Sequence, residues 1–547
     1  MNRPRLAFMI LHAVLAMIPC AVAVAQSLAA AHGNARHDSA STELVSTDRG
    51  GLRGKVVGSV EQFLGVPYAA PPTGDRRWTA PAPAPRWTGV RDATERSNSC
   101  LQANDSTLPT NEDCLYLNVY RPAHMHPVHS LPVLVWIHGG SNKNGAGNLY
   151  DPSEWVSKTG IIVVTLNYRL NVFGFLALPS LDAEADDTSS GNYGLLDQQA
   201  ALRWVHRNIA AFGGNAFNVT IAGHSAGAVD VCAHLVSPTA AGLFSKAILQ
   251  SNECKSTSHA AALQNGEAIA AALGCADMTT SAACLRAKTA TQLQTEGAST
   301  IGPNISGRVL PLSPDDAFLS GQWNHAPILL GSAHDEANGA VLAKVGYKLD
   351  INQYKRAVFF RFGSLAPAVL AEYKLEDYSD PAFAFAAENT DSRIACGMSR
   401  LTQQLSAITA TFRYEFADPN PPAPMSWNIP ADVPIGSYHG SELQYLFDVE
   451  KSESAPLSEA QRDLAARMMR YWANFAKRGN PNGPGLVRWP HDEFNTQHIL
   501  SFRPAGDAVI DTFDEDHHCA FWGLAGAAAR SSIKARSGEL SASAAAR

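Results

Sequence analysis

Residues 219–229 read VTIAGHSAGAV and contain the pentapeptide Gly-His-Ser-Ala-Gly at 223–227. This pattern is typical of a nucleophile elbow, the sharp turn between a strand and a helix that exposes a reactive serine. With 41 glycines and 44 serines in 547 residues, the pattern arises by chance roughly 0.2 times per chain, so its surroundings must support it. The apolar run before it predicts a buried strand, and the small apolar residues at 226–236 predict a helix. Ser225 is therefore a candidate nucleophile.

Short apolar runs alternate with helical patterns on both sides of this stretch. Such alternation predicts an α/β fold with a mostly parallel sheet flanked by helices. A helix is expected before residue 212, where apolar residues recur at three- and four-residue spacing up to Phe212-Gly-Gly214. The strand-like runs that matter for chemistry are residues 133–137, 161–166, 218–221 and 328–330.

Two further residues complete a candidate catalytic triad. A serine hydroxyl is a weak nucleophile at neutral pH and needs a histidine base, which in turn needs a carboxylate to orient it. In α/β hydrolases the three residues follow in the order serine, acid, histidine. Glu336 follows a strand pattern, with Asp335 beside it, and His439 lies in a loop after the strand pattern at 411–416. Ser225, Glu336 and His439 fit the order.

Several other segments carry recognisable signatures. They read FLGVPYAAPP at 63–72, EDCLYLNVY at 112–120, GNYGLLDQQAALRWVHRNIAAFGGN at 191–215, YHGSE at 438–442, WANF at 472–475 and GNPNG at 479–483. In these segments the chain resembles the type-B carboxylesterase/lipase family, which includes cholinesterases and microbial carboxylesterases. The resemblance covers about residues 50–523. It implies the α/β-hydrolase fold as a single catalytic domain, which we place at 46–523.

The resemblance also assigns roles to the candidate triad. It makes Ser225 the nucleophile, His439 the general base and acid, and Glu336 the orienting carboxylate, with Asp335 only a neighbour. The chemistry implied is ester hydrolysis through an acyl-enzyme, and it requires no metal or cofactor.

Disulfides are expected, but the residues alone do not assign them. Eight cysteines follow the N-terminal leader, and eight cysteines allow 105 pairings. The family resemblance implies three bonds and leaves Cys232 and Cys254 unassigned. The implied pairs are Cys100 with Cys114, Cys275 with Cys284, and Cys396 with Cys519.

The loop after strand 133–137 is expected to form the oxyanion hole. Backbone N–H groups of Gly140, Ser141 and Ala226 would face the developing negative oxygen, with Gly139 just behind them. The family usually has a third glycine, followed by an aromatic residue, where this chain has Ser141 and Asn142. A backbone donor survives such a change only where the dihedral angles suit a residue with a side chain.

His224 is a second departure from the family, which commonly has glutamate before the nucleophile. His224 is an alternative base, but adjacent residues at a tight turn project in different directions. We therefore expect it to lie behind the triad and to tune the charge of the site. A third departure is Ala337, which stands where a glycine usually follows the acid.

The first 25 residues resemble a secretory signal peptide. Arg3 and Arg5 precede an apolar run, and small residues lead to a predicted cleavage site after Ala25. We expect a flexible lead at 26–45 and a flexible tail at 524–547. The signal, together with the family resemblance, indicates an exported bacterial protein, secreted or periplasmic, without a stable membrane anchor.

The amino-acid composition narrows the classes of molecule that the protein is expected to bind. The net charge of −7, with acidic and basic residues interspersed, shows no basic surface of the kind that binds nucleic acid. A small-molecule ester is the expected substrate, and the oligomeric state stays open. The loop between Cys100 and Cys114 lacks the tryptophan with which cholinesterases hold a quaternary ammonium, and it is too short for a lipase lid.

Two alternative functions stay open. Amide, carbamate or polyester-type substrates could use the same acyl-enzyme chemistry, and a non-catalytic binding role is known for the fold.

Other polar residues that resemble catalytic or metal-binding groups are expected to have structural or surface roles. Glu442 is expected to be a structural partner within its helix, and the remaining histidines of note are expected in solvated, metal-free surface segments: His124, His126, His129, His517 and His518.

Overall fold

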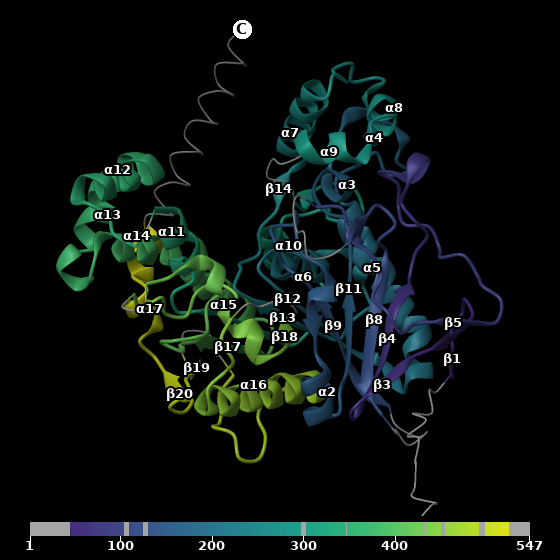
Figure 1. Ribbon diagram of the computed structural model, residues 1–547. Helices are drawn as coiled ribbons and strands as arrows, with labels where there is room; N and C mark the ends of the chain where they lie inside the picture. Colours follow the sequence, from purple (N-terminus) through teal and green to yellow (C-terminus); the bar gives the residue numbers. More distant parts are fainter. Residues whose placement is uncertain are drawn as a thin grey trace, which may run out of the picture. The chain divides into compact units, whose positions relative to one another are not determined.

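A mixed sheet of 11 strands forms the centre of the computed structural model (Figure 1). Its seven strands from β11 to β19 are parallel, and antiparallel strands complete both edges. The expected large, mostly parallel sheet is confirmed. In spatial order its strands are β20 (Ala508–Ile510), β19 (Ile499–Phe502), β17 (Thr411–Phe416), β16 (Ile328–Ala333), β13 (Lys246–Gln250), β12 (Gly214–His224), β9 (Leu131–Ile137), β11 (Ile162–Leu166), β8 (Tyr116–Pro122), β4 (Val60–Pro67) and β3 (Lys55–Val57).

The structure describes residues 44–102, 109–123, 130–296, 302–345, 347–430, 433–449, 454–491 and 498–524. All of them belong to one structural unit, Thr42–Arg547. The expected signal peptide, nearly all of the expected lead and tail, and the histidines at 124, 126 and 129 lie outside the described residues. Strand β1 begins at Leu44, two residues before the expected start of the catalytic domain.

Side chains of β9 alternate between two hydrophobic cores, one on each face of the sheet. Val133, Val135 and Ile137 join the core that contains α5, α6 and α15, whereas Leu134 and Trp136 join the core that contains α2 and α16. A parallel sheet covered on both faces needs apolar residues at every strand position, which explains the unbroken apolar runs in the sequence. The bounds of these helices are Ser153–Thr159 for α2, Tyr193–Asn208 for α5, Ala226–Val236 for α6, Cys396–Ser406 for α15 and Glu459–Arg478 for α16.

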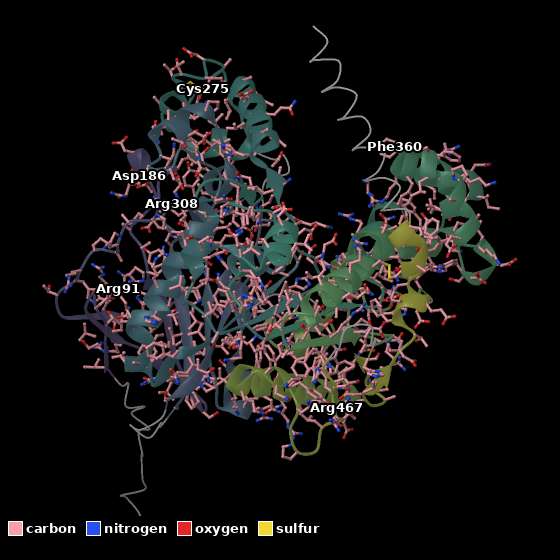
Figure 2. All side chains as sticks on the ribbon, turned by 180° about the vertical axis from the view of Figure 1, so that it is seen from behind. Arg91, Asp186, Cys275, Arg308, Phe360 and Arg467 are labelled. Carbon is pink, nitrogen blue, oxygen red and sulfur yellow. A yellow bond between two sulfur atoms is a disulfide. The ribbon has the colours of Figure 1, made fainter. Side chains whose placement is uncertain are left out.

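The remaining helices and small sheets surround this framework. Figure 2 marks α12 by Phe360 and α16 by Arg467. The helices are α3 (Asn171–Phe175), α4 (Pro179–Glu184), α7 (His259–Ala272), α8 (Ser281–Arg286), α9 (Ala290–Glu296), α10 (Pro314–Ser320), α11 (Asn338–Val345), α12 (Ile351–Phe362), α13 (Ala366–Glu372), α14 (Pro381–Thr390) and α17 (Phe513–Asp516). The small sheets pair β1 (Leu44–Ser46), β2 (Gly51–Arg53) and β5 (Val90–Asp92); β6 (Ser99–Cys100) and β7 (Thr110–Asn111); β10 (Tyr150–Asp151) and β18 (Asp448–Val449); and β14 (Thr257–Ser258) and β15 (Asn304–Ile305).

Four disulfides cross-link the described chain. Three join the cysteines that the family resemblance pairs, and the fourth joins the two cysteines left unassigned, Cys232 in α6 and Cys254 after β13. In the part of the chain that the structure covers, we find no helix both long and apolar enough to cross a membrane.

One expectation about the C-terminal region is wrong. His517 does not belong to an exposed charged run, because it is 3% exposed. Its Nδ1 lies 2.6 Å from Asp391 Oδ1, and its ring lies against the ring of His334. His517 directly follows the short helix α17, whose first residue, Phe513, is also buried, and a count of charged residues in the sequence does not reveal this burial.

Candidate active site

Ser225 occupies the turn between β12 and α6. Its backbone has φ 57° and ψ −121°, a conformation that is strained for a residue with a side chain. The Ser225 N–H donates to the carbonyl of Gln250 at 2.8 Å, which fixes the turn against the neighbouring strand β13. The side chain is partly exposed, while the residues on either side are buried. The turn therefore presents the hydroxyl at the carboxyl end of the parallel strands.

The two glycines of the pentapeptide permit this turn. A side chain at Gly227 would overlap the carbonyl of Ile137 at the end of β9, and one at Gly223 would overlap the carbonyl of Gly227. The pattern thus reflects how closely α6 approaches the sheet, because only glycine lets the backbones come this near.

Glu336 and His439 lie together although 103 residues separate them. His439 Nδ1 is 2.5 Å from Glu336 Oε2. The backbone N–H of His439 also donates to the backbone carbonyl of Glu336 at 3.1 Å. Glu336 is buried, and its other carboxylate oxygen accepts from the Ala333 N–H at 2.8 Å. The side chain of His439 remains 32% exposed. The carboxylate is therefore fixed at one end, and the imidazole has a free edge.

The electrostatic surroundings increase the proton affinity of His439. Burial disfavours the cation, but the charge and hydrogen bond of Glu336 outweigh burial and raise the pKa of His439 above its ordinary 6.5. Such a histidine gains stability when it accepts a proton, which is what a general base requires.

The loop after β9 keeps a glycine-like backbone in spite of its serine. Gly140, Ser141 and Asn142 all have positive φ, at 108°, 59° and 55°. Gly140 and Ser141 are exposed, whereas Asn142 is buried. A left-handed conformation costs a serine about 1–2 kcal/mol, so contacts elsewhere must hold the loop.

Asn142 supplies those contacts. Its amide N–H donates to Asp230 Oδ1 in α6 at 3.0 Å, and its amide oxygen accepts from the Tyr168 hydroxyl at 3.0 Å. The same hydroxyl lies 2.8 Å from the His138 carbonyl, and Gln198 also donates to Asp230. Sequence reasoning did not identify this network, because its members come from four separate elements.

Replacing Asn142 with alanine is expected to destabilise the fold by about 1–3 kcal/mol, because the buried Asp230 and Tyr168 each lose one hydrogen bond and keep only those to Gln198 and to the His138 carbonyl. Chemical denaturation measures this loss. Asn144→Ala is the matched control, since Asn144 is an exposed residue of the same loop. Equal stability of the two variants would contradict the anchoring role of Asn142.

His224 packs behind the triad and faces Glu442. The rings of His224 and His439 have their centroids 4.5 Å apart, and His224 Nε2 lies 3.6 Å from Glu442 Oε1. Burial and the positive charge of His439 lower the pKa of His224, while burial and the charge of Glu336 raise the pKa of Glu442 to about 7. Glu442 lies in the short helical segment Ser441–Tyr445, but it contacts His224, Gln250 and Ser251 outside it. Glu442 does lie in a helix, as expected, but the side chains that it contacts lie in other elements.

Comparison of the whole sequence with known proteins agrees with the geometry of the elbow and of the Glu336–His439 pair. The sequence profile of the carboxylesterase family matches residues 41–522. The chain belongs to the carboxylesterase family. Among relatives of this carboxylesterase, cocaine esterase of Oryctolagus cuniculus is 33% identical over 516 residues, which cover 86% of this chain and 93% of that protein. Acylcarnitine hydrolase of Mus musculus is 32% identical over 505 residues, with 84% and 88% covered.

A solved structure supports the same conclusion. PNB esterase matches the carboxylesterase with a TM-score of 0.74 and 30% sequence identity, covering 86% of this chain and 98% of that one. The α/β-hydrolase fold inferred from the sequence is thereby confirmed.

Proposed function

We propose that this carboxylesterase hydrolyses small to medium carboxylic esters through an acyl-enzyme on Ser225, with His439 as general base and acid and Glu336 as its orienting carboxylate. The observation that carries the proposal is the Glu336–His439 hydrogen bond, whose imidazole packs against His224, the residue that precedes Ser225 in the strained elbow. Family membership supports ester hydrolysis in general, and the residue roles and the substrate size are our own inference.

The reaction has two steps. In the first, Ser225 Oγ attacks the ester carbonyl while His439 takes the hydroxyl proton, and the alcohol leaves with that proton. In the second, His439 takes a proton from water as the hydroxide attacks the acyl-serine, and it then returns that proton to Ser225 Oγ as the acyl–oxygen bond breaks and the acid is released. We assign the N–H groups of Gly140, Ser141 and Ala226 to the oxyanion of each tetrahedral intermediate.

A fluorophosphonate probe tests the proposal. Covalent labelling of Ser225 in the folded protein, followed by turnover of esters of graded acyl length, is the expected result. Failure to label would favour a non-catalytic binding role. Faster turnover of amide, carbamate or polyester substrates than of simple esters would favour the second candidate.

The pH profile of kcat/KM is a further test. His439 accepts a proton only when neutral, and its pKa is raised, so activity is expected to fall as the pH decreases through a midpoint above 6.5. An ester without ionisable groups keeps the substrate constant across the range. An acidic midpoint at or below 6.5 would contradict the influence of Glu336 on this histidine.

We further propose that the protein acts outside the cytoplasm, in the periplasm or as a secreted enzyme. The four disulfides support this location, because such bonds persist in oxidising compartments.

A further inference from the structure

A second cluster of metal-ligand-type side chains includes none of the three triad residues, although His334 lies only two residues before Glu336. His334 follows β16, Glu415 lies in β17, and His517 follows α17. One nitrogen or oxygen from each of the three side chains lies within 4.8 Å of the corresponding atom of the other two. Three segments far apart in the sequence therefore direct ligand-type atoms toward one point.

Two atoms of this cluster are buried without a hydrogen-bond partner. Glu415 Oε1 and His517 Nε2 lie 3.7 Å apart, on residues that are 1% and 3% exposed. At this distance an imidazolium and a carboxylate attract each other as an ion pair but form no hydrogen bond, so part of the cost of burying the two polar atoms remains. An atom placed between them would remove this cost.

The other polar atoms of the three side chains are already engaged. His517 Nδ1 lies 2.6 Å from Asp391 Oδ1, Glu415 Oε2 accepts from the Ser501 hydroxyl at 2.9 Å, and His334 Nδ1 lies 3.2 Å from Asp335 Oδ1. A histidine that binds a metal typically donates its second ring N–H to a carboxylate, which fixes its tautomer and orientation. Both histidines have such a carboxylate.

We propose that His334, Glu415 and His517 bind one divalent transition-metal ion, with zinc as the best match. Two imidazoles and one carboxylate are a common zinc ligand set, whereas calcium and magnesium prefer oxygen ligands alone. Tetrahedral zinc places its ligand atoms about 3.4 Å apart. The observed separation of 3.7 Å between the Glu415 and His517 atoms is near this value, and His334 needs a small shift.

One of the three proposed ligands, His334, borders a cavity. The His334 side chain is 43% exposed and lines a cavity of about 810 Å³ together with Asp418, Arg503 and residues around them. An ion reaching the cluster from this cavity keeps its remaining coordination position toward solvent. Once bound, it links the segment that carries Glu336 to β17 and to the C-terminal segment that carries Cys519.

Calorimetric titration of the full, untagged, chelator-treated protein with Zn²⁺ tests the proposal without using activity. We expect one ion per chain, an increased melting temperature with Zn²⁺, and no comparable binding of Mg²⁺. Co²⁺ in the same site should give visible absorption bands.

His334→Ala is the informative variant, because the partly exposed His334 can be removed with little effect on packing. It is expected to weaken Zn²⁺ binding by at least about tenfold, whereas His325→Ala, which removes an exposed histidine elsewhere, should bind as the wild type does. Glu415→Gln should weaken binding similarly if the variant folds. Absence of Zn²⁺ binding, or equal affinity of the His334→Ala and His325→Ala variants, would overturn the proposal and identify the cluster as a His517 imidazolium paired with Asp391 and Glu415.

Discussion

Replacing Ser225 with alanine is expected to reduce kcat for a simple ester by a factor of about 10⁴–10⁶, the loss typical of a missing nucleophile. The hydroxyl is the atom that forms the acyl-enzyme, so no neighbouring side chain replaces it. The elbow should stay intact, because its backbone hydrogen bond to Gln250 does not involve the Ser225 side chain. Steady-state hydrolysis of the wild type and the variant measures the effect.

Ser157→Ala is a suitable control for this experiment, since Ser157 is an exposed serine of helix α2. It should retain wild-type kcat. If the Ser225→Ala variant kept more than about a tenth of the activity, a residue other than Ser225 would be the nucleophile.

The second large effect separates the two histidines beside the elbow. His439→Ala is expected to lower kcat by about 10⁴–10⁶-fold, whereas His224→Ala should lower it by roughly tenfold or less. His439 has a carboxylate at 2.5 Å and a partly exposed ring, as a proton carrier needs. His224 is buried against Glu442, and burial lowers its pKa, so it accepts a proton poorly.

Both variants must be checked for folding, because His224 is a buried residue whose loss leaves a cavity. Thermal unfolding separates a loss of stability from a loss of chemistry. The reverse ranking, with activity retained in His439→Ala and lost in His224→Ala, would make His224 the base.

The elbow and the strands around it could be predicted because their signals are local. Residues 219–229 specify a strand, a tight turn and a helix in one continuous stretch, and β12 and α6 follow that prediction closely. The positions of Glu336 and His439 required the order of residues known from the family, because nothing in the sequence between them indicates that they meet.

Features built from distant residues could not be predicted in the same way. The hydrogen bonds of Asn142 to Tyr168 and Asp230 depend on how three elements pack against one another. In the sequence, nothing distinguishes these three residues from other polar residues. His517 was misinterpreted for a related reason. Its acidic neighbours in sequence suggested an exposed segment, whereas its partners in space, Asp391 and Glu415, lie more than 100 residues earlier.

The Cys232–Cys254 disulfide has a consequence for how the enzyme matures. It joins the helix that begins at the nucleophile to the segment after Gln250, whose carbonyl holds the Ser225 N–H. Closing a loop of 22 residues removes chain entropy equivalent to about 3 kcal/mol from the unfolded state. We expect assembly of the elbow to be coupled to thiol oxidation, so that the redox potential of the compartment governs how much active enzyme a given amount of newly made chain yields.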